Sequence, residues 1–160
     1  TLIGYISTSS NWNEYAIYGK TVARGAMTLP EFIDGYNLVN EEDFMVEYIA
    51  KGDTSSDNSI TAKLDGYAIK KGTGNYSYAG SNLTEKTSTG MNFYIIDTDK
   101  AIHMWLASNN VDTGSSVWRV YSGGHLYGAN YDDGRGGLCP VVSLTCGILS
   151  ENENGNIEVK

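Results

Sequence analysis

The feature that most constrains this chain is a long stretch, Ala101 to Ser150, that contains neither Lys nor Glu. Its charged side chains are few, whereas Lys and Glu crowd the first hundred residues. Lys and Glu are depleted at protein interfaces relative to other surface, so the stretch suits a recognition surface. A strand-rich, glycine-rich half with little helix explains the same depletion, and at this point the two explanations are about equally good.

Length and composition favour one domain of strands and turns. A chain of 160 residues is close to the usual size of one domain, so residues 1–160 are expected to form a single unit. The 19 Gly and 12 Tyr point to turns and strands rather than to a helical bundle. A net charge of −8 argues against binding to nucleic acid or to a membrane surface. No apolar run approaches the roughly 20 residues of a membrane span.

The two cysteines are expected to be free thiols. Cys139 and Cys146 lie in what the pattern indicates is one strand. Extended chain rises about 3.3 Å per residue, which separates the two residues far beyond the roughly 5.5–6 Å Cα spacing of a disulfide.

The first half of the chain is expected to hold one helix among short strands. The helix begins at the capping box Thr28-Leu29-Pro30-Glu31, carries Phe32 and Tyr36 one turn apart, and ends near Asn37. Polar loops or turns are expected at Thr8–Asn13, Gly52–Ser59 and Lys70–Gly90. Strands are expected at Leu2–Ile6, Glu14–Tyr18, Asp43–Ala50 and Ile60–Ile69, the last broken at Asp65-Gly66.

The second half is expected to be a series of hairpins. Met91–Ile96 pairs with Ala101–Ala107, and Val117–Tyr121 pairs with His125–Tyr131 across Ser122-Gly123-Gly124. Leu138–Thr145 is the most apolar strand of the chain. Residues 151–160 are expected to begin with a polar turn at Glu151–Gly155 and to end as a polar tail or an edge strand.

Two stretches of this half resemble a known group of domains. Trp105-Leu106-Ala107-Ser108, followed by a Gly/Tyr-rich hairpin and then Gly137-Leu138-Cys139-Pro140-Val141-Val142-Ser143-Leu144, resembles the closing third of many bacterial and phage-associated domains. Those domains share a Trp-Leu-(Arg/Ala)-Ser strand and a terminal Gly-Val-Arg-Pro-Val-Val-Ser-Leu strand. Thr28–Phe32 through Gly35–Asn37 is similar to the helix that they carry. The match covers about 60 residues in separate pieces, and Cys139 stands where the group usually has Arg.

The resemblance implies a C-type-lectin-like fold of the formylglycine-generating-enzyme branch, which also houses variable proteins diversified by retroelements. Such a fold is α+β, with one or two helices packed on a small, mostly antiparallel sheet and with long loops. Its ligand-facing hairpins lie near the C-terminus. The resemblance places the protein outside the cell, at a cell surface or on a virion, and it raises retroelement diversification of the hairpin segment as a weaker hypothesis.

The candidate recognition surface is the segment Ser115–Gly137, whose composition is close to that of an antibody paratope. Alternation places His125, Tyr127, Ala129 and Tyr131 on one face. If Val117 and Val120 both face the core, a bulge or twist must intervene. The expected outward, ligand-binding side chains are Trp118, Arg119, Tyr121, His125, Tyr127, Asn130, Tyr131, Asp132, Asp133 and Arg135.

Several functions remain open on these grounds. The favoured one is a non-enzymatic binding or adhesion module for a protein or glycan ligand. Tyr/Gly hairpins also stabilise sheets through cross-strand aromatic pairs without any ligand. The alternative is a self-associating structural subunit of a surface filament or virion, and a cysteine- or copper-dependent oxidase comes third.

The residues favour neither a cofactor nor a metal. The chain has only 2 His, so a His-based metal site is not expected. Asp132 and Asp133 are the best calcium ligands in the chain, but their surroundings do not match an EF-hand loop, and a turn explains them better. Cys139 with His125 could form a nucleophile–base pair by composition, but no local signature supports that chemistry.

Overall fold

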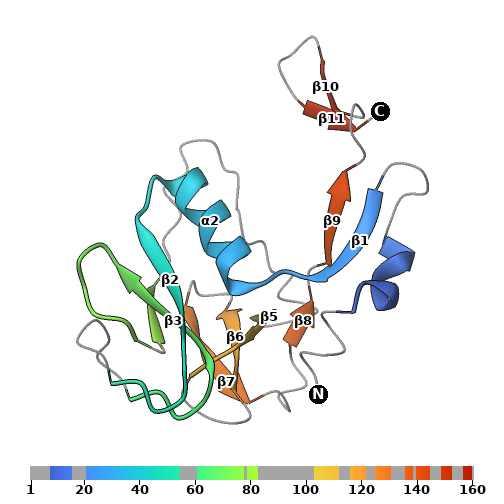
Figure 1. The fold of residues 1–160 in the computed structure, drawn as a ribbon. Helices are drawn as coiled ribbons and strands as arrows, with labels where there is room; N and C mark the ends of the chain where they lie inside the picture. The colour runs from blue at the N-terminus through green and yellow to red at the C-terminus, as the bar shows by residue number, and fades with distance from the viewer. Residues whose placement is uncertain are drawn as a thin grey trace.

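The computed structural model describes residues 8–15, 21–54, 61–77, 79–82, 103–111, 116–121, 125–130, 136–138, 140–144, 149–152 and 157–159. In this part of the chain one α-helix packs on a five-stranded sheet, accompanied by three two-stranded antiparallel pairs (Figure 1). The predicted α+β class, with a helix on a small and mostly antiparallel sheet, is confirmed.

Helix α2 (Leu29–Asn40) begins where the sequence predicts it. The Thr28 side chain accepts a hydrogen bond from the Glu31 amide at 3.4 Å, and the Glu31 carboxylate accepts one from the Thr28 amide at 2.9 Å. This reciprocal pair satisfies two amides that a helix start otherwise leaves without partners. Phe32 and Tyr36, one turn apart, stack with their ring centroids 6.2 Å apart.

The helix ends at Asn40 rather than near Asn37, so its expected end is wrong by almost one turn. Leu38 and Val39 continue the helix although both side chains are exposed. The stop is made by Glu41, which adopts the left-handed conformation (φ 53°) and donates its amide to the Asn37 carbonyl. Such a left-handed residue commonly closes a helix.

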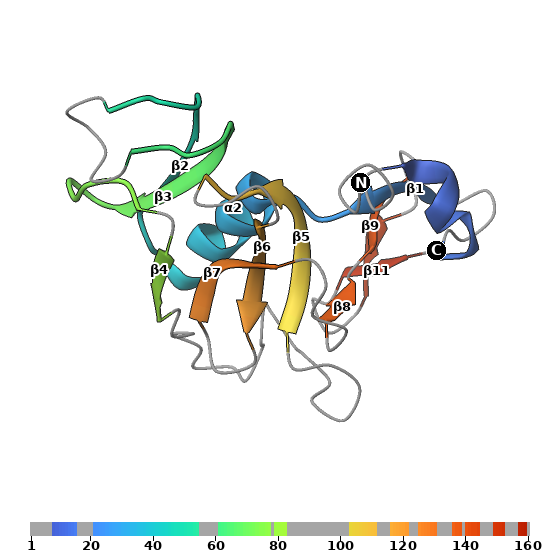
Figure 2. The same cartoon turned by 90° about the horizontal axis from the view of Figure 1, so that it is seen from below.

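The main sheet has the strand order β4 (Ala79–Asn82), β7 (His125–Asn130), β6 (Ser116–Tyr121), β5 (His103–Asn109) and β8 (Gly136–Leu138). Figure 2 shows β4, β7, β6 and β5 side by side, with α2 against one face. The predicted hairpin of the second half is confirmed, because β6 and β7 pair antiparallel, with Val120 opposite Leu126. β8 adds to β5 in the parallel direction.

Two hydrogen bonds fix the start of α2 to strand β5. The Ala107 amide donates to the Met27 carbonyl at 2.7 Å, and the Leu29 amide donates to the Ser108 hydroxyl at 2.9 Å. The first amides of a helix have no partner within the helix, and buried Ser108 provides one of them with an acceptor. The Trp105–Ser108 stretch therefore has a structural role in docking the helix.

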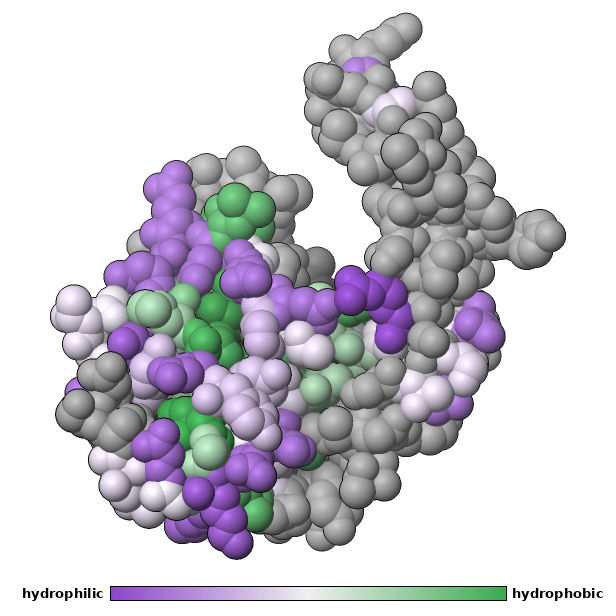
Figure 3. All heavy atoms as spheres, viewed as in Figure 1, coloured by the Kyte–Doolittle hydropathy of each residue, from purple (hydrophilic) through white to green (hydrophobic). Residues whose placement is uncertain are grey.

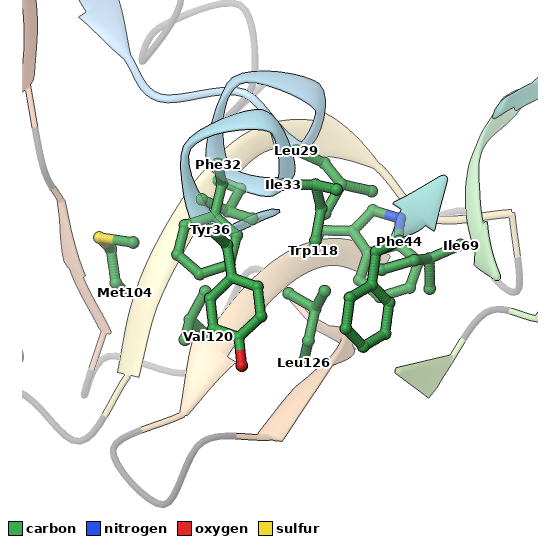
Figure 4. Close-up of a cluster of buried hydrophobic side chains, with 11 residues drawn as sticks. Leu29, Phe32, Ile33, Tyr36, Phe44, Ile69, Met104, Trp118, Val120 and Leu126 are labelled. Carbon is green, nitrogen blue, oxygen red and sulfur yellow. The ribbon is translucent and has the colours of Figure 1, made fainter. Parts of the chain in front are cut away.

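The main core lies between α2 and the sheet (Figure 4). Trp118 is fully buried there, and its indole N–H donates to the Tyr67 carbonyl at 2.9 Å. Tyr36 meets the Phe44 ring edge-on at 6.0 Å. The cluster consists of Leu29, Phe32, Ile33, Tyr36, Phe44, Ile69, Met104, Leu106, Trp118, Val120 and Leu126.

Strands β2 (Phe44–Ile49) and β3 (Gly66–Lys71) form a separate antiparallel pair. The strand expected at 43–50 is confirmed. The strand expected at 60–69 is wrong in its limits, since residues 61–65 are irregular and the strand begins only at Gly66. Gly66 is needed at that point because a Cβ would lie 2.9 Å from the Asn109 carbonyl oxygen.

The expected polar connection at 70–90 is also wrong in part. Lys70 and Lys71 complete β3, and Ala79–Asn82 forms β4. Tyr76 is buried in a second, smaller cluster, where it helps to cover Ile49, Ala62, Ala68 and Val111. Its ring also lies 4.4 Å from the Lys70 ammonium, so one tyrosine anchors a segment that is otherwise polar.

The apolar segment expected as one strand at 138–145 is divided between two sheets. β8 ends at Leu138, and β9 (Pro140–Leu144) pairs with β1 (Thr21–Ala26) instead. Pro140 has no amide hydrogen to donate, and the first position of a strand tolerates this. β10 (Leu149–Glu151) pairs with β11 (Ile157–Val159), which fulfils the edge-strand alternative for the C-terminal end. Figure 1 shows β1–β9 and β10–β11 to one side of the main sheet.

The turn expected at 8–13 and the start of the strand expected at 14–18 are wrong in the described residues of this segment, which end at Tyr15. Ser9–Tyr15 forms the 3₁₀ helix η1, and it buries Trp12. Several other expectations lie outside the described residues: the strands at 2–6 and 91–96, and both cysteines.

Candidate functional site

The five-stranded sheet has two chemically different faces. Side chains alternate between faces along a strand, so Trp118, Val120 and Leu126 point toward α2 while their neighbours point away. The face turned away from α2 carries two adjacent rungs of polar and aromatic side chains across β5, β6 and β7. We call these six residues the array: Trp105, Arg119 and Tyr127 in the first rung, and His103, Tyr121 and His125 in the second.

The first rung is centred on Arg119, which lies opposite Trp105 on β5 and Tyr127 on β7. The guanidinium carbon is 4.7 Å from the centroid of the Tyr127 ring and 5.7 Å from that of Trp105. Arg119 Nη2 also donates to the Tyr127 hydroxyl at 2.9 Å. Cation–π attraction and this hydrogen bond together hold Tyr127 in one orientation.

The second rung begins with His103, which is fully buried beside Arg119. Arg119 Nη1 lies 3.1 Å from His103 Nδ1 and 3.4 Å from Nε2. A guanidinium can only donate, so an imidazole nitrogen of His103 is the acceptor in this contact. The imidazole also meets the Trp105 indole edge-on at 4.6 Å. His103 thus links the two rungs.

A glycine makes room for the array at the β8 edge of the sheet. Gly136 lies opposite His103 in the parallel β5–β8 pair. A Cβ on Gly136 would overlap Nε1 and Cδ1 of Trp105 and would lie 2.6 Å from His103 Nε2. Any larger residue at this position would displace the two side chains that support Arg119.

Exposure rises across the array from β5 toward β7. His103 and Trp105 are buried, Arg119 is 9% exposed, Tyr121 and Tyr127 are half-buried, and His125 is exposed. The Tyr121 and His125 rings meet across the hairpin with their centroids 6.5 Å apart. An accessible trio of Tyr121, His125 and Tyr127 therefore rests on a buried support of Trp105, His103 and Arg119.

Known proteins give no guide to this site. No protein-family model, curated protein or solved structure matches the chain. Its function must therefore be inferred from these residues themselves.

Nine of the ten predicted outward residues fall into three groups, and Trp118 stands apart from them. Arg119, Tyr121, His125 and Tyr127 share the face turned away from α2, as expected, although Arg119 is buried. The backbone of Asn130 lies at the end of β7, opposite Ser116. Tyr131, Asp132, Asp133 and Arg135 lie outside the described residues.

The prediction for Trp118 is wrong. Its side chain is fully buried under α2, opposite Gly128 on β7 and one residue before Arg119, and so on the other face. Val117 and Val120 are both buried. The β6–β7 register runs without a shift, but the β5–β6 register shifts between Trp105 and Asn109, opposite Arg119 and Val117, so the irregularity expected for two buried valines lies on the β5 side.

Trp105 and His103 were missed as parts of the site. Trp105 stands in the motif that carries the family resemblance, and His103 lies between Ile102 and Met104 in an apolar run typical of a packed strand. Only the β5–β6 register places them beside Tyr121 and Arg119. His103 and Trp105 are two residues apart, so the sequence places them on one face of their strand. This spacing does not say which strand lies next to β5.

The array presents aromatic rings and hydrogen-bonding groups at its accessible end. Aromatic rings supply flat contact area, and imidazole and phenol groups supply hydrogen bonds. Within the described residues no group of three or more His, Cys, Asp or Glu side chains could hold a metal ion. Nor does this part of the chain contain a helix long and apolar enough to cross a membrane.

Proposed function

We propose that the chain is a non-enzymatic ligand-binding module that recognises a protein or glycan through the accessible trio of the array, Tyr121, His125 and Tyr127. Tyrosines give large contact area at a low cost in side-chain entropy and dominate many natural recognition surfaces. The trio lies on strands of a packed sheet, and rigid elements hold binding groups more precisely than loops.

The observation that carries the proposal is the support beneath Tyr127. A buried arginine donates to the phenol and lies against its ring, and it is itself held against His103 and Trp105. A tyrosine needed only to cover apolar surface gains little from such a charged partner. A side chain that is fixed before binding loses less entropy when the ligand arrives, which favours affinity.

We further propose that the fold is C-type-lectin-like. Two features support this. One helix packs on a mostly antiparallel sheet, and a Tyr/Gly hairpin of the C-terminal third carries the candidate site. The Trp105–Ser108 stretch that carries the resemblance contributes both to the array, through Trp105, and to the docking of α2, through Ser108.

The test is a binding screen over protein and glycan libraries with wild-type protein and a triple variant, Tyr121→Ala, His125→Ala and Tyr127→Ala. We expect the variant to lose ligands that the wild type binds through this face, because truncating central aromatic anchors typically costs 2 kcal/mol or more each, roughly a thirtyfold loss of affinity. Two of the three residues are half-buried and one is exposed, so the variant should remain folded by circular dichroism.

The matched control is Asn13→Ala, an exposed residue of η1, which lies outside both the main sheet and strand β2. It should bind like the wild type. If every ligand bound the triple variant and the wild type equally well, the array would not be a binding surface. Replacing the whole Ser115–Gly137 segment is unsuitable as a test, since it would delete the core residues Trp118, Val120 and Leu126.

A further inference from the structure

A second surface of the molecule lies at the outer edge of strand β2. In an antiparallel strand the amide and carbonyl of one residue point to the same side, and successive residues alternate. The Phe44 amide and carbonyl both bond to the Asn37 side chain, at 3.1 and 2.7 Å. They therefore point away from β3, and so do those of Val46 and Tyr48.

The partner strand confirms this orientation independently. Ile69, opposite Val46, exchanges both of its backbone hydrogen bonds with Ser77, at 3.0 and 2.9 Å. Ile69 therefore faces away from β2, as the partner of an outward-facing residue must. The residue before Phe44 shows the opposite arrangement, because the Asp43 carbonyl accepts a hydrogen bond from the Gly72 amide at 3.3 Å and so points toward the β3 side.

Asn37 already occupies one end of this edge. Its side-chain amide binds Phe44 in the way a neighbouring strand would, with one donor and one acceptor. Among the described strands, only β3 pairs with β2. The amide and carbonyl of Val46 and of Tyr48 thus form a short edge directed away from the sheet, and such an edge is a template for another strand.

Exposed apolar side chains surround this edge. Leu38 is 82% exposed, Tyr48 57% and Met45 50%, and they are the three most exposed large apolar side chains of the described residues. Asn37 brings the end of α2 directly against the start of β2. Figure 3 shows apolar surface over this end of α2, with hydrophilic surface around it. Apolar groups beside a strand edge favour added chain over water.

Charge distinguishes two candidate occupants of the edge, a second copy of this chain and a segment of another protein. In the antiparallel pairing with a second copy that sets Val46 opposite Tyr48, Glu47 lies opposite Glu47 of the second copy. Like charges directly opposite one another destabilise a pair of strands, and the whole chain carries a net charge of −8. Glu47 is exposed, so it is free to face a cation.

We propose that the β2 edge binds an extended segment of another protein by strand addition. The segment places a Lys or Arg opposite Glu47 and apolar residues beside Met45 and Tyr48. Because Asn37 closes the Phe44 end, the segment forms only a short ladder with Val46 and Tyr48. This binding surface is separate from the array and does not depend on the function proposed for it.

Proline provides a test that acts on one side of the strand. Val46→Pro removes the outward amide hydrogen and spares the β2–β3 ladder, whereas Glu47→Pro removes a hydrogen bond of the ladder itself, opposite Ala68. The probe is a phage-displayed library of random linear dodecapeptides, selected on wild-type protein. Clones specific for the edge should bind Val46→Pro about tenfold more weakly, which corresponds to about 1.4 kcal/mol.

Val46→Ala is the matched control, because it removes the same packing and keeps the amide hydrogen; the selected clones should still bind it. Thermal melts should show that Val46→Pro remains folded and that Glu47→Pro is clearly less stable. The proposal is overturned if no selected clone distinguishes Val46→Pro from Val46→Ala.

Glu47→Lys tests the charge without relying on proline. Synthetic peptides made from the selected clones should carry Lys or Arg opposite Glu47, and replacing that residue by Glu should weaken their binding to the wild type. The Glu47→Lys protein should prefer the Glu peptides instead. If the preference does not reverse, the charge argument fails. A wild-type dimer in sedimentation that Val46→Pro abolishes would overturn the proposal in favour of self-pairing.

Discussion

The two faces of the five-stranded sheet differ in almost every physical respect, although its central strands β5, β6 and β7 contribute to both. Toward α2, β6 presents Trp118 and Val120, which are fully buried among apolar side chains. Away from α2, the same strand presents Arg119 and Tyr121, which contact imidazole, phenol and indole groups. A shift of one residue along β6 separates a packing role from a candidate binding role.

The comparison teaches that residue type alone does not assign a side chain to a face. Trp118 and Trp105 are both buried tryptophans on neighbouring strands. Trp118 packs against α2 and donates to a backbone carbonyl, whereas Trp105 supports a cation and an imidazole. Parity and register decide which role each one has.

The largest expected effect tests the face toward α2. Trp118→Ala should destabilise the fold by about 3–5 kcal/mol, because it opens a large cavity in the core and leaves the Tyr67 carbonyl without its donor. Chemical denaturation monitored by circular dichroism measures this loss. Trp118→Phe keeps most of the volume and should lose clearly less. If Trp118→Ala were nearly neutral, the distinction between the two faces would be wrong.

A smaller effect is expected where β8 meets the array. Gly136→Ala should cost about 1–3 kcal/mol, because the new methyl group overlaps a buried indole. Trp105→Phe removes the Nε1 atom that the methyl group strikes. In a double-mutant cycle the two changes should therefore cost less together than the sum of their separate costs. Strict additivity would mean that Gly136 is needed for some other reason.

The sequence predicted those elements that local chemistry specifies. The capping box of α2, the turn-flanked hairpin β6–β7 and the strand β2 are each encoded by a few neighbouring residues, and each is present. Glu14 and Tyr15 resembled the start of a strand but belong to η1, and the segment 138–145 resembled one strand but serves two sheets. Such outcomes depend on partners far away in the chain, and local patterns do not contain them.

The candidate site was predictable to the same extent. Tyr121, His125 and Tyr127 follow from the hairpin and its alternation, since all of them belong to one pair of strands. Trp118 was misplaced because the direction of α2 relative to β6 is a tertiary fact. His103 and Trp105 reach the site only through the β5–β6 register, which no short-range signal fixes.

The smallest expected change in stability sharpens the face turned away from α2. Arg119→Lys keeps the positive charge but loses the planar fork that reaches both His103 and Tyr127, so stability should fall by about 1 kcal/mol. Tyr127→Phe removes the same hydrogen bond from its other end, and denaturation of both variants and of their combination gives the coupling between them. Because the two residues share one hydrogen bond, the double variant should lose less stability than the two single variants added together.

For any ligand found in the binding screen, Arg119→Lys should weaken binding although Arg119 is only 9% exposed, since Tyr127 would lose its fixed orientation. A variant that lost stability but bound unchanged would make Arg119 part of the scaffold alone, and both faces of the sheet would then serve packing.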